Sequence, residues 1–138
     1  MALNKKEIII SSDPLNLDQI EIFIKEIFDF LHLDENLFNR VMLCVNEAVI
    51  NSISHGNRFD DNKKVIVQSF FCKKYLYFRV IDEGAGFNYK DLPDPTKDDN
   101  LNKESGRGIY IIKQISGEMY FREKGKVVEF KIELNGIN

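Results

Sequence analysis

Three polar side chains stand at intervals of four residues near the middle of the chain: Glu47, Asn51 and His55. In a helix, residues four apart lie on the same flank. An asparagine oxygen can bind Mg²⁺, which takes its other ligands mainly from waters and phosphates. A neighbouring carboxylate can accept the proton of an attacking hydroxyl group. By itself the spacing fits a solvated helix face better than a site, and we give His55 no catalytic role because it resembles an ordinary helix-end residue.

A second carboxylate, Asp82, closes a segment with strand composition. The alternate residues that share its face of the strand are apolar: Leu76, Phe78 and Val80. If this face is the core side, Asp82 needs a partner, because an unpaired buried charge is costly. The exocyclic amine of a purine is a suitable donor. Gly84 and Gly86 would let the backbone approach a flat ring. The alternative is a strand-to-loop turn in which the glycines only allow bending.

A third element, Gly106-Arg107-Gly108, opens a predicted helix after a long polar segment. Free N–H groups at a helix start attract phosphate, and glycine allows close approach. Arg107 would add positive charge. A flexible loop end is the alternative for this motif alone. The order of the three elements together favours a nucleotide held between helices and a sheet.

Two helices are predicted to position the first element. One begins at Asp13, a good N-cap, with Pro14 at the first helical position. Its apolar residues recur at helical spacing: Leu17, Ile20, Phe23, Ile24, Ile27, Phe28 and Leu31. Ile22 points away from this stripe and is a candidate for a dimer or partner contact.

The second helix is predicted over 34–54 and carries Glu47 and Asn51 beside its apolar stripe. Leu43 and Ile50 lie off that stripe, which predicts that the helix is covered on two sides. Strands are predicted at 7–10, 64–71, 75–81, 118–122 and 127–134, and a further helix at 108–116. The polar segment 83–105 is predicted to be a long functional loop.

Composition excludes several classes of protein. The chain has 138 residues, enough for one domain with a real core. Its net charge of −3 and pI near 5.4 argue against a nucleic-acid binder. No stretch is long and apolar enough for a signal peptide or a membrane span. Cys44 and Cys72 lie in apolar runs without metal-ligand spacing, so we expect two buried reduced thiols in a cytoplasmic protein.

The motifs resemble those of the GHKL (Bergerat-fold) superfamily of histidine-kinase-like ATPase domains. NEAVINSISHG (46–56) is similar to the N-box of that family, and DEGAGF (82–87) to its first glycine box. LPDPT (92–96) is similar to its ATP lid, and GRGI (106–109) to its second glycine box. Within the superfamily, the lid most resembles that of the anti-sigma factor serine/threonine kinases, and the likeness extends over almost the whole chain.

This resemblance implies a single domain over residues 1–138, with an α/β two-layer sandwich in which helices cover one face of a mixed, mostly antiparallel sheet. Glu47 would be the general base and Asn51 the Mg²⁺ ligand. Asp82 would bind the adenine amino group of ATP or ADP. The nucleotide-lining residues would be Gly84, Gly86, Gly106, Arg107 and Gly108.

The resemblance also implies partners. The family phosphorylates a serine or threonine of an anti-anti-sigma (STAS-domain) protein and binds a sigma factor, usually as a homodimer. Neither direct nucleic-acid binding nor a membrane is expected. The alternative function is a nucleotide-dependent binding switch with little or no phosphotransfer. A detached histidine-kinase ATP domain fits less well, because the lid favours the serine-kinase branch.

Overall fold

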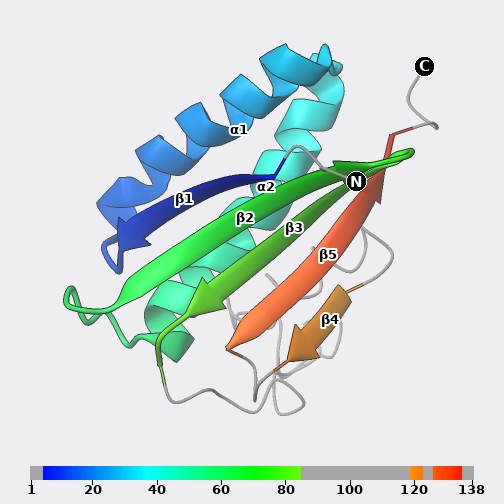
Figure 1. The fold of residues 1–138 in the computed structure, drawn as a ribbon. Coiled ribbons are helices and arrows are strands. Elements are labelled where there is room, and N and C mark those ends of the chain that lie inside the picture. Colours follow the sequence, from blue (N-terminus) through cyan, green and yellow to red (C-terminus); the bar gives the residue numbers. More distant parts are fainter. Residues whose placement is uncertain (1–4, 85–118, 123–125, 135–138) are drawn as a thin grey trace, which may run out of the picture.

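The computed structural model describes residues 5–84, 119–122 and 126–134 (Figure 1). Four of the predicted nucleotide-lining residues lie outside these ranges: Gly86, Gly106, Arg107 and Gly108. The predicted helix at 108–116 and nearly all of the predicted loop also lie outside them.

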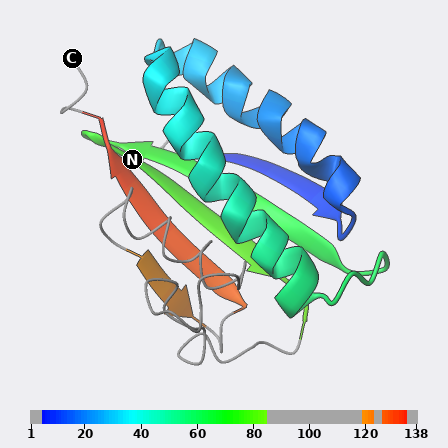
Figure 2. The same ribbon diagram turned by 180° about the vertical axis from the view of Figure 1, so that it is seen from behind.

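The described residues form two layers, with helices on one face of a five-stranded sheet (Figures 1 and 2). The strand order is β1-β2-β3-β5-β4, and all four pairings are antiparallel. This architecture confirms the predicted α/β sandwich. The elements are β1 (Lys6–Ser11), α1 (Leu17–Leu31), α2 (Glu35–Asn51), β2 (Lys64–Cys72), β3 (Tyr75–Asp82), β4 (Met119–Arg122) and β5 (Val127–Glu133).

Helix α1 begins as predicted, although its first turn is tighter than an α-helix. The Asp13 side chain accepts a hydrogen bond from the Leu15 N–H, and the 3₁₀ turn Pro14–Asn16 leads into α1. The helix ends at His32, whose left-handed backbone (φ 55°) closes the last turn. The predicted stripe packs inward, and Ile22 is 60% exposed, so its outward position is confirmed.

Helix α2 is capped by Asp34, whose carboxylate accepts from the Asn36 N–H. Its stripe faces the sheet, but Leu43 and Ile50 are 41% and 38% exposed. The prediction that they are covered was therefore wrong. They lie on the outer side of α2, away from its buried stripe, and no other described helix or strand encloses them.

The core lies between the helices and one face of the sheet. Alternate strand residues point into it, and Phe78 stacks on Phe130 with ring centroids 5.6 Å apart. On the opposite face of the sheet, Arg79 donates to Glu129 and Gln68 donates to Glu7. This alternation places Asp82, in register with Val65, on the helix side of β3.

The two cysteines differ in their surroundings. Cys44 is buried in α2, whereas Cys72 is only half-buried where β2 turns into β3. The prediction of two buried thiols was therefore wrong for Cys72, because a residue at a hairpin end is covered less than one inside a helix–sheet interface. Among the described residues, no helix has the length and apolar character needed to cross a membrane.

Candidate functional site

Asp82 lies at the end of β3 with its carboxylate enclosed by protein. It is 3% exposed, which confirms that it faces the core side. Its Oδ1 accepts from the Gly84 N–H at 2.9 Å, whereas its Oδ2 is buried without a hydrogen-bond partner. Burial raises the pKa of the Asp82 carboxyl above its usual value, while the Gly84 hydrogen bond and the charges of Lys126 and Lys63 oppose that rise. A buried acceptor of this kind suits a ligand that donates a hydrogen bond.

The end of α2 is pressed against this carboxylate. The helix widens after Asn51 into a π-type turn, Ser52–Gly56, which the Asn57 N–H closes by donating to the Ser52 carbonyl at 2.7 Å. A methyl group added at Gly56 would overlap the Asp82 carboxylate. Such widened turns occur often at functional sites. The π-type turn therefore packs the end of the helix that carries Asn51 against the end of β3, which carries Asp82.

Gly84 lies against the same helix end. A methyl group added at Gly84 would overlap the carbonyl of Gly56. The sequence suggested that Gly84 lets a flat ring approach the backbone. The structure adds a different reason, since Gly84 is also required by the close contact between two segments of the chain itself.

Substituting either glycine tests this contact. We expect Gly56→Ala and Gly84→Ala each to destabilise the fold by about 1–3 kcal/mol, because the added methyl group would displace the Asp82 carboxylate in the first variant and the Gly56 backbone in the second. Thermal unfolding should show a melting temperature lower by several degrees for each variant. Ser54→Ala in the same turn is the control, since Ser54 is only half-buried and alanine removes atoms without adding any. Native melting temperatures for both glycine variants would refute the contact.

Asn51, the last residue of α2, is 6% exposed, and its Nδ2 is buried without a partner. Three buried side-chain atoms of the described residues lack a partner: Asn46 Oδ1, Asn51 Nδ2 and Asp82 Oδ2. Two of the three belong to residues that the sequence predicted as binding groups. A half-turn of the carboxamide exchanges its nitrogen and oxygen, so Asn51 can offer a donor to phosphate or an oxygen to Mg²⁺.

Asn51 and Asp82 lie on two elements that contact each other. Gly56, at which an added methyl group would overlap Asp82, follows Asn51 by five residues through the π-type turn. The structure therefore brings together the carboxylate and the carboxamide that the sequence placed 31 positions apart.

Glu47 lies one turn before Asn51 and is half-buried. It is close enough to Cys44 to influence that thiol. Burial raises the pKa of Cys44 to about 12, Arg40 opposes the rise, and Glu47 adds to it. Cys44 therefore remains a neutral thiol at physiological pH and is not a nucleophile.

The carboxamide of Asn51 is a ligand type that hard cations accept. Within residues 5–84, 119–122 and 126–134, no group of three His, Cys, Asp or Glu side chains gathers to hold a metal ion. A Zn²⁺ centre normally needs three or four such ligands from the protein. Mg²⁺ needs only one or two. Asn51 is thus compatible with Mg²⁺ that is bound together with a nucleotide.

Sequence reasoning missed Asn57. This residue is 1% exposed, and its side chain hydrogen-bonds to three separate segments. The only signal was the pair Gly56-Asn57, which is typical of a helix end. That signal locates the end of α2, but it does not show that the amide reaches the end of β3.

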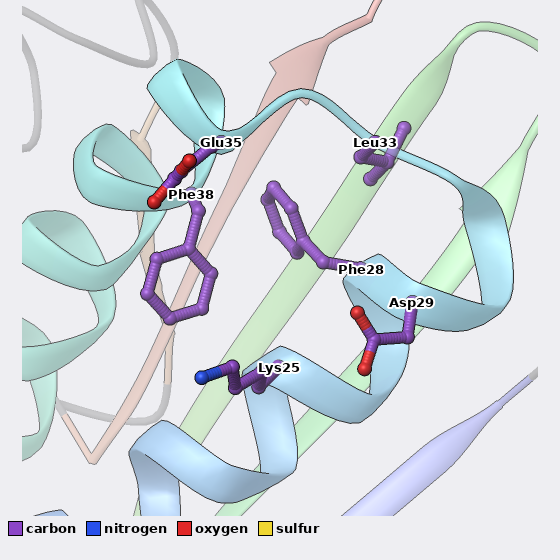
Figure 3. A pocket seen from close by; sticks show the side chains of 6 residues that line it. All are labelled: Lys25, Phe28, Asp29, Leu33, Glu35 and Phe38. Carbon is purple, nitrogen blue, oxygen red and sulfur yellow. The ribbon is translucent and has the colours of Figure 1, made fainter.

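A separate hollow of about 280 Å³ opens at the other end of α2 (Figure 3). Its floor contains Phe28 and Phe38, packed edge to face at 5.3 Å, and Lys25, Asp29, Leu33 and Glu35 complete its lining. It contains none of the predicted site residues. About 25 Å of helix separates the two ends of α2, so this hollow is not part of the candidate site.

Comparison with known proteins supplies independent findings. Residues 10–132 match the family described as histidine kinase-like ATPase domain. Two anti-sigma F factors from strains of Clostridium perfringens are each 31% identical over 101 residues, which cover 69% of this chain and 71% of each relative.

A solved structure shares the fold. The crystal structure of the RsbU and RsbW domains of a Mycobacterium tuberculosis protein matches with a TM-score of 0.67 at 12% identity. The match covers 94% of this chain and 32% of that one, so the present chain spans about a third of its length. At this identity the likeness concerns the fold alone.

Proposed function

Because the chain belongs to the histidine kinase-like ATPase domain family, we propose that it is an ATP-dependent serine/threonine protein kinase that also acts as an anti-sigma factor. The observation that carries the nucleotide assignment is the buried Asp82 Oδ2, an acceptor with no partner in the described protein. The relatives named anti-sigma F factors support the regulatory role.

Three side chains have separate roles in this proposal. Asp82 accepts a hydrogen bond from the adenine amine and thereby selects ATP and ADP over GTP, which has a carbonyl at that position. Asn51 holds Mg²⁺ beside the phosphates. Glu47 accepts the proton of the incoming hydroxyl group. When bound, ATP supplies the γ-phosphoryl group, and Mg²⁺ neutralises its charge.

The phosphoacceptor is proposed to be a serine or threonine of an anti-anti-sigma (STAS-domain) protein. Its hydroxyl oxygen forms the new bond to the γ-phosphorus, the bond to the ADP oxygen breaks, and the proton passes to Glu47. The second partner is a sigma factor, which the chain binds and thereby restrains. We place these events in the cytoplasm and expect a homodimer.

A phosphotransfer assay tests the proposal. The chain is incubated with Mg²⁺, labelled ATP and a candidate STAS protein, beside a calorimetric titration with ATP and GTP. Label on a serine or threonine, together with preference for ATP, is expected. ATP binding without any transfer would instead favour the nucleotide-dependent switch, and equal affinity for GTP and ATP would contradict the role of Asp82.

Ile22 is the residue of α1 that we propose for a dimer or partner contact, because it is apolar and faces outward. Ile22→Glu should lower dimer or partner affinity about tenfold, as expected for an apolar contact residue. Its melting temperature should stay native. Leu15→Glu is the control, since Leu15 is also an exposed apolar residue of the same region. Light scattering and pull-down measure the effect, and native affinity would remove Ile22 from the interface.

A further inference from the structure

Asn57 joins three segments of the chain through one buried side chain. Its Nδ2 donates to Ser12 Oγ at 2.7 Å and to the Lys64 carbonyl at 2.9 Å. Its Oδ1 accepts from the Glu83 N–H at 2.9 Å. Both amide hydrogens and one acceptor position of the carboxamide are therefore used.

The neighbours of Asn57 allow only one orientation of its amide. The Lys64 carbonyl can only accept, and the Glu83 N–H can only donate. Ser12 Oγ donates its own hydrogen to the Lys63 carbonyl at 2.8 Å, so it must accept from Asn57. Other small side chains cannot supply two donors and one acceptor in this geometry.

The Oδ1 contact acts on the strand end that carries Asp82. Glu83 is the next residue after Asp82, and its side chain accepts from the Lys64 N–H. The backbone N–H of Asn57 closes the wide turn that ends α2. Asn57 therefore links the helix end to the end of β3, next to the contact between Gly56 and Asp82.

The backbone after Asn57 is strained. Arg58 and Phe59 both have left-handed backbones, with φ of 52° and 59°. Two such residues in a row cost free energy unless the surroundings hold them in place. The Phe59 N–H donates to the Ile53 carbonyl at 2.8 Å, and the bonds of Asn57 hold the residue before. The two left-handed residues are thus held in place directly after Asn57, where the chain leaves the helix end.

We propose that Asn57 is a positioning residue for nucleotide recognition: its amide holds Asp82 Oδ2 at the distance and direction from Asn51 that let one nucleotide contact both. This inference rests on the proposed nucleotide binding. Without the amide the end of β3 can shift relative to α2, and the base and the phosphates can no longer be held together. Asn57 itself does not need to touch the ligand.

The test compares affinities for ATP and GTP in Asn57→Ala. Calorimetry well below the melting temperature, with the binding stoichiometry as a measure of folded protein, should show ATP affinity lower by about tenfold or more. GTP affinity should change little, so the ratio of the two affinities falls. A residue that only stabilises the fold would lower the melting temperature and leave that ratio native.

Two matched variants separate these roles. Asn16 also uses its amide to hold a turn, donating to the carbonyl and the hydroxyl of Ser11, but it touches no predicted site residue. Ser12→Ala removes the arm of the Asn57 network that leads away from Asp82, together with the Ser12 hydrogen bond to the Lys63 carbonyl, and leaves the Asn57 bond to Glu83 in place. Asn16→Ala and Ser12→Ala should lower stability and keep the native ratio. An unchanged ratio in Asn57→Ala, or an equal loss in Ser12→Ala, would overturn the positioning role.

A measurement on the native chain covers the case in which Asn57→Ala does not fold. Hydrogen exchange of the Glu83 N–H, the donor to Asn57, should slow about tenfold or more in saturating ATP and much less in GTP. Equal exchange with and without ATP would overturn the proposal. If the native chain binds no adenine nucleotide, the proposed function fails. If it binds ATP selectively and Asn57→Ala does so equally, only the positioning role fails.

Discussion

Glu47→Gln should slow phosphate transfer to the STAS partner by roughly 10²–10⁴-fold, the usual effect of a lost general base. Glutamine has nearly the same shape as glutamate but cannot accept the proton of the incoming hydroxyl group. Because Glu47 is proposed to act only on that hydroxyl, ATP affinity should remain nearly native. Single-turnover transfer of labelled phosphate, beside an ATP titration, measures both quantities.

Asn51→Ala supplies the contrast for this experiment. Loss of the Mg²⁺ ligand should weaken metal-dependent ATP binding and every later step, so the two variants should fail in different assays. Glu35→Gln changes the other glutamate of α2, which lies at its exposed first turn, and should be silent. Native transfer rates in Glu47→Gln would mean that the general-base assignment is wrong.

Asp82→Asn should weaken ATP binding by roughly 10–100-fold, as expected when a hydrogen bond to a charged acceptor is lost. The same change should stabilise the ligand-free fold at neutral pH by about 1 kcal/mol, because it replaces a buried carboxylate, whose charged form burial disfavours, with a neutral amide. Calorimetry and chemical denaturation measure the two effects. A variant that loses affinity while it gains stability is the signature of a group kept for binding.

The pH dependence has a definite sign. Burial raises the pKa of Asp82 in the folded chain, so folding favours the protonated carboxyl. The stability that this group contributes is present in acid and is lost as the pH rises through the raised pKa. The advantage of Asp82→Asn should therefore be greatest at neutral pH and shrink toward acid pH. Asp61→Asn, at an exposed position, is the control. A constant difference across the pH range would contradict the assignment.

The spacing of apolar residues along the chain was sufficient to predict the helices and strands that the structure describes. Apolar residues at helical spacing located both helices, and the alternation along β3 placed Asp82 on the same face as Leu76, Phe78 and Val80. These inferences succeed because a helix or strand buries one face whichever element covers it. Whether a given side chain is covered depends on segments that are distant in the sequence. For this reason the burial of Leu43, Ile50 and Cys72 was predicted wrongly.

The candidate site was only partly predictable for a related reason. Asp82 and Asn51 have side chains whose chemistry can be inferred from type and position. The contribution of Asn57 depends on hydrogen bonds to residues 45 and 26 positions away, and no local spacing encodes those partners. The widened turn after Asn51 is equally invisible in the sequence, since its residues are compatible with an ordinary α-helix.

The strand order also has a consequence for synthesis of the chain. Strand β1 pairs with β2, which follows both helices in the sequence, so α1 and α2 are made before the strands that complete their apolar cover. At 5–20 residues per second, the 31 residues between the ends of α2 and β3 take roughly 2–6 s to emerge. Helix formation and collapse are far faster. For those seconds the nascent helical pair presents its apolar stripes to water, to other chains or to a chaperone at the ribosome.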